Sequence, residues 1–217
     1  MERGGVGLVL DSKRGSVDFI MDPAARAFRN VNPNAISAVA LALAGVSGAL
    51  IYFSYDYWQV LLPLAGFLML VSGFLDGLDG KVARLTGKGS KRGDFVDHVF
   101  DRYADVLMIG AVAVSAWCNT YLGLLAVVGV MLTSYMGTQA QAVGAGRHYG
   151  GVLGRADRLV LMILATFLTW ILLLFDIRSF TIMSYTITVF EIMMLWFAVV
   201  GNLTAIQRAV STYRSLK

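Results

Sequence analysis

Long apolar runs, separated by short polar segments, dominate the sequence. They cover about residues 35–54, 59–75, 106–117, 121–143, 159–175 and 180–206. The hydrocarbon core of a bilayer is crossed by about 20 helical residues. The third run is shorter, but a helix that begins near residue 94 extends it to a spanning length. The runs therefore predict an all-α integral membrane protein with six transmembrane helices.

Composition and charge agree with a membrane protein and exclude other classes. Hydrophobic residues make up 57% of the 217 residues and charged residues only 15%, which is far from the balance of a soluble core. The net charge of +4 is modest, and the basic residues lie between apolar runs, so we expect no nucleic-acid partner. The single cysteine, Cys118, excludes an internal disulfide and argues against a thiolate metal site.

The basic residues predict the orientation in the membrane. All but Arg102 and Arg178 of the 18 Lys and Arg residues lie in the amino-terminal segment, after the second or fourth apolar run, or at the carboxyl end. Cytoplasmic loops carry an excess of Lys and Arg. We therefore expect a multi-pass protein of the cell membrane with both termini on the cytoplasmic side.

The residues before the first apolar run predict a surface helix. Ile20, Ala24, Phe28 and Val31 recur at helical spacing within residues 18–31, which is typical of an amphipathic helix in the membrane interface. A plain polar tail is the alternative. We expect two parts, an amino-terminal segment of residues 1–31 with this interfacial helix and a six-helix domain of residues 32–217.

Four aspartates are placed at the polar ends of the second and third predicted membrane helices. Asp76 and Asp79 are three residues apart, and Asp97 and Asp101 are four apart. These spacings put each pair on one helix face, so two antiparallel helices could bring all four together. Clustered carboxylates are costly without a cation and favour hard divalent ions, Mg²⁺ or Mn²⁺. We expect a metal site at the cytoplasmic edge of the membrane.

The pattern D-x2-D-G-x2-A-R-x8-G-x3-D-x3-D fills residues 76–101. It resembles the signature of the CDP-alcohol phosphotransferase family at every position. The resemblance implies a metal-dependent membrane enzyme, a homodimer, that transfers a phosphatidyl-type group from a CDP-linked lipid to an alcohol and releases CMP. The donor is then of the CDP-diacylglycerol or CDP-archaeol type, and the active site is on the cytoplasmic side.

The resemblance also assigns roles to single residues. Asp76, Asp79 and Asp97 become metal ligands in a two-metal site of Mg²⁺ or Mn²⁺, and Asp101 becomes both a ligand and the base that deprotonates the acceptor. The CDP-lipid would contact the small or basic residues of the signature and two residues near it, which are Gly80, Ala83, Arg84, Gly93, Ser90 and Asn34.

The acceptor is predicted from Arg155 and Arg158 at the start of the fifth membrane helix. They are either membrane anchors or a clamp for an acceptor phosphate, since Arg favours bidentate phosphate contacts. Similar pairs occur in family members that use inositol phosphate, so the resemblance favours a phosphorylated polyol such as inositol phosphate as the acceptor. The basic pair that those members carry on the fourth helix would fall at Gly137 and Gln139, so glycerol 3-phosphate and serine stay open as acceptors.

Two other classes compete with this interpretation. Membrane prenyltransferases also use Asp-rich helices with Mg²⁺, but they are normally longer and carry a second Asp-rich motif, which this sequence does not contain. An ion transporter would have carboxylates distributed through its spans, whereas six aspartates are crowded into residues 76–105. One acidic residue, Glu191, is expected well inside the last membrane helix, facing protein or water.

Overall fold

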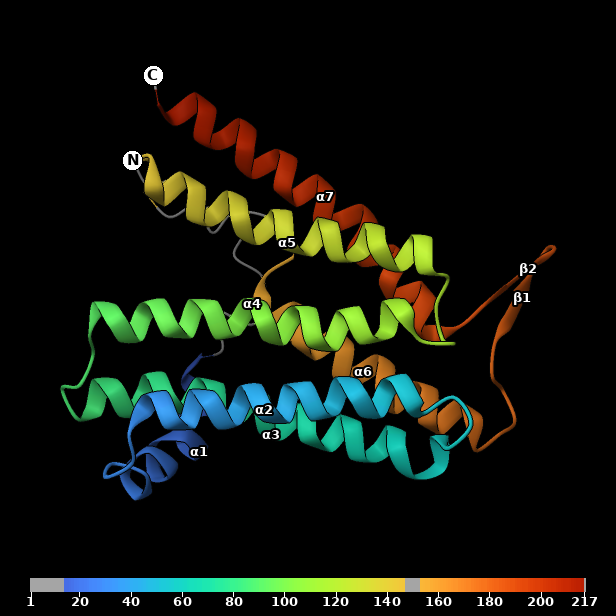
Figure 1. The fold of residues 1–217 in the computed structure, drawn as a ribbon, viewed down its shortest axis with the longest axis horizontal. Coiled ribbons are helices and arrows are strands. Elements are labelled where there is room, and N and C mark those ends of the chain that lie inside the picture. Colours follow the sequence, from blue (N-terminus) through green and yellow to red (C-terminus); the bar gives the residue numbers. More distant parts are fainter. Residues whose placement is uncertain (1–13, 147–152, 217) are drawn as a thin grey trace. The chain divides into compact units, whose positions relative to one another are not determined.

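The computed structural model describes residues 14–146 and 153–216, and helices dominate them (Figure 1). Their bounds are α1 Arg14–Ala27, α2 Pro33–Phe53, α3 Trp58–Leu85, α4 Lys91–Val114, α5 Thr120–Ala142, α6 Arg155–Leu173 and α7 Val189–Ser215. A short antiparallel hairpin, β1 Phe180–Ile182 and β2 Tyr185–Ile187, separates α6 from α7. The all-α class is therefore confirmed. Residues 1–13 of the predicted amino-terminal segment lie outside the described residues.

Five of the described helices are long and apolar enough to cross a membrane, namely α2, α3, α5, α6 and α7. Helix α4 has 24 residues, but charged residues are frequent from Lys91 to Asp105. These charges keep α4 out of the set of five, although the rest of the helix is apolar. Six spans therefore remain a prediction.

The last predicted membrane helix begins later than we expected. Residues 180–187 form the β-hairpin, with Thr181 opposite Thr186, instead of the start of a helix over 180–206. Aromatic and β-branched residues alternate with polar ones here, and such residues favour strands over helices. Helix α7 starts only after Thr188, whose hydroxyl accepts a hydrogen bond from the backbone N–H of Glu191 at 3.0 Å.

Glu191 consequently lies in the first turn of α7, and the expectation that it sits deep inside a membrane helix is wrong. Its carboxylate accepts hydrogen bonds from the backbone N–H groups of Thr188, at 3.0 Å, and Asn119, at 2.9 Å. Thr188 also donates its hydroxyl to the Trp117 carbonyl at 2.7 Å. Glu191 caps α7 and ties it to the turn before α5, so it has a structural role.

The chain forms two compact parts, and the first comprises the described residues up to Val112. Helices α2 and α3 lie side by side in it (Figure 1). At one end α1 packs against α3, around a core of Ala25, Ile36, Leu78 and Val82. Phe19 of α1 is 84% exposed, as suits the predicted interfacial helix, whose membrane position stays a prediction.

Small residues let the helices of this part approach closely. A Cβ added to Gly48 of α2 would lie 2.4 Å from the carbonyl oxygen of Leu107 on α4. A Cβ added to Gly77 of α3 would lie 2.7 Å from the Met21 methyl group on α1. These contacts join α2 to α4 and α3 to α1.

The second part, built from α5, α6, the hairpin and α7, is held by a close crossing of α5 and α7. A Cβ added to Gly201 would lie 2.9 Å from the carbonyl carbon of Gly129. Thr133 donates its hydroxyl to the Gly201 carbonyl at 2.7 Å. Small residues and side-chain hydrogen bonds of this kind are typical of membrane helix interfaces.

Candidate active site

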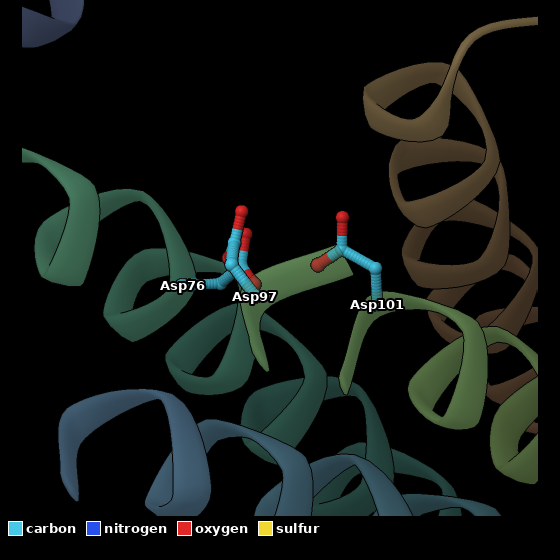
Figure 2. Close-up of side chains that lie close together, drawn as sticks. All are labelled: Asp76, Asp97 and Asp101. Carbon is cyan, nitrogen blue, oxygen red and sulfur yellow. The ribbon is translucent and has the colours of Figure 1, made fainter. Parts of the chain in front are cut away.

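Three aspartates from two helices meet at one place. Asp76 lies on α3, and Asp97 and Asp101 lie one turn apart on α4. One carboxylate oxygen of each lies within 4.8 Å of the others (Figure 2). Asp76 and Asp97 are half-buried, and Asp101 is buried. The spacing along each helix aims the side chains, and the packing of α3 and α4 brings them together.

The electrostatics of this cluster favour a bound cation. Three carboxylates at this separation repel one another, and the repulsion is weakly screened where Asp101 is only 6% exposed. The guanidinium of Arg102 lies 3.7 Å from Asp101 and 3.8 Å from Asp105, so it is shared with a further carboxylate. An all-oxygen donor set fits a hard divalent ion, Mg²⁺ or Mn²⁺.

Asp79 lies outside the set of three that the described residues form. Its side chain is buried and accepts a hydrogen bond from the hydroxyl of Ser37 on α2. The predicted role of Asp79 as a metal ligand stays a prediction. Ser37 was not expected at the site. The only signal for it in the sequence is a small polar residue two positions after the start of the first apolar run.

Three residues predicted to contact the CDP-lipid lie together where α2 and α4 begin. The Ser90 hydroxyl accepts a hydrogen bond from the backbone N–H of Gly93 at 3.0 Å, which caps α4. A Cβ added to Gly93 would lie 3.4 Å from that hydroxyl oxygen and 3.7 Å from the side-chain oxygen of Asn34. The absence of a side chain at Gly93 therefore leaves a surface open between Ser90 and Asn34.

The other predicted CDP-lipid residues follow Asp79 on α3. Gly80 and Ala83 are half-buried, and Arg84 is exposed near the end of the helix. A Cβ added to Gly80 would lie 3.4 Å from Nη1 of Arg84, so this guanidinium lies along the face that Gly80 leaves bare. The contacts of all six residues with a nucleotide stay predictions.

In the second part of the chain, two arginines reach consecutive residues of α5. Arg158, only 2% exposed, has Nη2 3.5 Å from the hydroxyl of Ser134. Arg208 of α7 donates a hydrogen bond from Nη1 to the Thr133 carbonyl at 2.7 Å. Arg155, half-buried, opens α6. Arg208 was not predicted, because the last membrane helix was expected to end at residue 206.

Comparison with known proteins gives the class of the chain. The family model for CDP-alcohol phosphatidyltransferase matches residues 30–204. The chain belongs to this family, and with its apolar helices it is a multi-pass membrane protein. The match covers the three clustered aspartates and the helices that carry them.

Similar proteins of the family carry inositol-related names. The chain is 33% identical over 113 residues to an archaetidylinositol phosphate synthase of Pyrococcus horikoshii, covering 52% of this chain and 60% of that protein. It is 27% identical over 205 residues to a phosphatidylinositol phosphate synthase of Cutibacterium acnes, covering 90% and 93%. A bifunctional IPC transferase and DIPP synthase of Archaeoglobus fulgidus matches over 157 residues, at 29% identity, and only 31% of its length is spanned.

Solved structures share the fold. The phosphatidylinositol phosphate synthase of Mycobacterium tuberculosis, in a crystal structure with CDP-DAG bound, superposes with a TM-score of 0.69 at 20% identity, covering 89% of this chain and 94% of that chain. The same protein in complex with manganese and citrate gives a TM-score of 0.68.

Proposed function

We propose that this chain is a phospholipid synthase that transfers a phosphatidyl-type group from a CDP-linked lipid to inositol phosphate and releases CMP. The observation that carries the proposal is the cluster of Asp76, Asp97 and Asp101 within 4.8 Å, inside the segment that matches the family. The names of the similar proteins support the inositol phosphate acceptor.

The four signature aspartates, Asp76, Asp79, Asp97 and Asp101, hold two divalent ions in this proposal. Such ions supply charge neutralisation for the diphosphate and for the attacking and leaving oxygens. The carboxylate of Asp101 takes the proton of the acceptor hydroxyl. The oxygen of that hydroxyl attacks the lipid-side phosphorus, and the bond from this phosphorus to the CMP oxygen breaks. Arg102, 3.7 Å from Asp101, favours its ionised form as a proton acceptor.

The donor nucleotide binds along the open surface between Asn34, Ser90 and Gly93 and along the face of Gly80 in the same proposal. Backbone without a Cβ allows close approach of a ligand. Arg84 supplies a permanently charged, forked donor for a phosphate oxygen, and Ala83 leaves room beside it.

Arg155 and Arg158 bind the phosphate of the acceptor, together with Arg208, which contacts the same turn of α5 as Arg158. One observation keeps glycerol 3-phosphate as a second candidate. Gly137 and Gln139 stand on α5 where inositol-phosphate-using members carry basic residues. The enzyme acts on the cytoplasmic side of the membrane as a homodimer, as the family resemblance implies.

Measurement of CMP release tests the proposal. Purified protein, a CDP-lipid and Mg²⁺ or Mn²⁺ are incubated with inositol phosphate, glycerol 3-phosphate, serine or free inositol in separate reactions. We expect release with inositol phosphate. Release only with glycerol 3-phosphate would identify a different acceptor but would still agree with a phosphate-binding role for Arg155 and Arg158. Release only with serine or free inositol would contradict that phosphate-binding role. No release with any acceptor would contradict the proposed transferase.

The proposed binding of the acceptor phosphate by Arg155 and Arg158 can be tested separately. Arg158→Lys keeps the charge and loses the forked geometry, and Arg155→Ala removes a charge. We expect each to raise the KM for the phosphorylated acceptor about 10- to 100-fold, the value of one or two hydrogen bonds between charged groups. The KM for the CDP-lipid should change much less. Arg178→Ala serves as a control, because that guanidinium lies 5.8 Å from the centre of the Trp117 ring, beyond the other end of α6. Equal increases in the KM values for both substrates would indicate that the two arginines only anchor the helix in the membrane.

A further inference from the structure

Among the four signature aspartates, Asp79 has a hydrogen-bond partner on a third helix. Its Oδ2 accepts the hydrogen bond from Ser37 of α2, and the two side chains are 4% and 7% exposed. Asp76, Asp97 and Asp101 come only from α3 and α4. The hydroxyl group of Ser37 therefore links α2 to the aspartates of the candidate site.

The hydroxyl of Ser37 has one proton and two oxygens within reach. The carbonyl of Pro33 is 3.1 Å away, one helical turn back. The Asp79 carboxylate is nearer and charged, and a charge-assisted hydrogen bond is about twice as strong as a neutral one. The proton is therefore directed to Asp79. This contact matters because Asp79 is buried close enough to Asp76 and Asp97 for their charges to repel it.

We propose that Ser37 is a positioning residue for the metal site, and this rests on the proposed function. Its hydroxyl holds Oδ2 of Asp79, fixes the rotation of the carboxylate and leaves Oδ1 as the ligand atom for a divalent ion. Hydrogen bonds from a second shell of residues orient metal ligands, and their loss typically weakens metal binding 10- to 100-fold. Helix α2 thereby contributes to metal affinity without supplying a ligand.

The same interface offers a matched control. Ser72 of α3 is buried, like Ser37, and donates its hydroxyl across the contact of α2 and α3, to the carbonyl of Ala40 at 2.8 Å. It therefore resembles Ser37 in burial and in joining the same two helices, but its acceptor is a backbone oxygen instead of a carboxylate. A purely structural role for these hydroxyl groups predicts similar effects at both positions.

Binding of Mn²⁺ alone tests the proposal without any turnover. Free Mn²⁺ is measured by its paramagnetic resonance signal during titration of the detergent-solubilised protein. We expect Ser37→Ala to raise the Kd for Mn²⁺ by about tenfold or more, and Ser37→Thr, which keeps a hydroxyl, to restore it within about threefold. Ser72→Ala should bind like the unchanged protein. Unchanged affinity in Ser37→Ala, or an equal loss in Ser72→Ala, would overturn the proposal.

If Ser37→Ala fails to fold, a second variant can test the same proposal. Ser37→Cys keeps nearly the same bulk and replaces the hydroxyl by a weak donor, and Mn²⁺ has little preference for sulfur. We expect it to weaken Mn²⁺ binding in the same direction as Ser37→Ala. Mn²⁺ affinity equal to that of the unchanged protein would count against Ser37 as a positioning residue.

The metal dependence of turnover gives a second test, because a change in packing alone would not alter it. In the CMP-release assay, Ser37→Ala should raise the Mn²⁺ concentration for half-maximal rate about tenfold and leave kcat at saturating Mn²⁺ within about threefold. A fall in kcat without a shift in metal dependence would contradict the positioning role. If the unchanged protein releases no CMP with any acceptor, the proposed function fails, while the Mn²⁺ titrations still decide the role of Ser37.

Discussion

At the scale of single residues, the clustered aspartates differ in their surroundings although they share one chemistry. Asp76 and Asp97 are half-buried, whereas Asp101 is buried beside Arg102. A buried carboxylate with a cationic neighbour can stay ionised and accept a proton. This difference in surroundings is the physical reason to propose Asp101 as the base, and Asp76 and Asp97 as metal ligands alone.

Replacing Asp101 by Asn tests the base. We expect CMP release to fall by about 10² to 10⁴, the usual contribution of general base catalysis, while CDP-lipid binding remains measurable. Asp94→Asn is the control, because that carboxylate is on the same helix, lies outside the cluster of three and is 69% exposed. Undiminished turnover in Asp101→Asn would remove Asp101 as the base.

Cys118 lies in the turn between α4 and α5, and we expect its reactivity to depend on pH. Burial, and then the charge of Glu191, raise the pKa of its thiol to about 12. Only the thiolate reacts with a maleimide, so labelling of the folded protein at pH 8 should be far slower than labelling of the unfolded chain at the same pH. Glu191→Gln removes the neighbouring charge and should raise the rate. Equal rates for folded and unfolded protein would contradict the raised pKa.

At the scale of elements, glycine residues allow the helices to cross closely. The α5–α7 crossing at Gly129 and Gly201 and the α2–α4 approach at Gly48 both leave less room than a methyl group needs. In a bilayer, helix association depends on such packing, because lipid tails are as apolar as the side chains they replace. The crossing of α5 and α7 also determines where Arg208 meets α5.

Gly201→Ala tests this crossing. Its Cβ would lie 2.9 Å from the backbone of Gly129, so the helices must separate. We expect a loss of about 1–3 kcal/mol of stability, as for other overpacked sites, seen as a lower midpoint of thermal unfolding in detergent. Gly110→Ala on α4 is the control, since an added Cβ there meets no atom within 4 Å among the described residues. A midpoint for Gly201→Ala that matches Gly110→Ala would show that the crossing adapts without cost.

At the scale of the whole molecule, family membership and the apolar helices define a multi-pass membrane protein, and orientation is the property still to be tested. The positive-inside rule predicts that the α3–α4 loop, which holds Lys88, faces the cytoplasm together with Lys91 at the start of α4. The turn between α2 and α3, with Asp56, should then face the opposite side.

Labelling of single cysteines tests this orientation. In a Cys118→Ser background, Lys88→Cys and Asp56→Cys place thiols at two exposed positions. We expect a maleimide that cannot cross membranes to label Lys88→Cys only in inverted vesicles and Asp56→Cys only in right-side-out vesicles. The reverse pattern would place the candidate active site on the outer side.

Much of the fold and the core of the candidate site could be predicted from the sequence, because they depend on local periodicity. Length and hydropathy define a spanning helix, and spacings of three and four place Asp76 beside Asp79 and Asp97 beside Asp101 on one helix face. The hairpin at residues 180–187 was missed, because a short apolar run of β-branched and aromatic residues is compatible with either a strand or a membrane helix.

The contacts between helices could not be predicted from the spacing of residues. Ser37 and Asp79 are 42 residues apart, and Arg208 and Thr133 are 75 apart. No spacing along one helix encodes such a pair, because it depends on how closely and at what angle two helices pack. Hydropathy and residue spacing along the chain were enough to predict long apolar helices with aspartates at their ends. Packing decided that three of these aspartates meet one another and that the fourth meets a serine of α2.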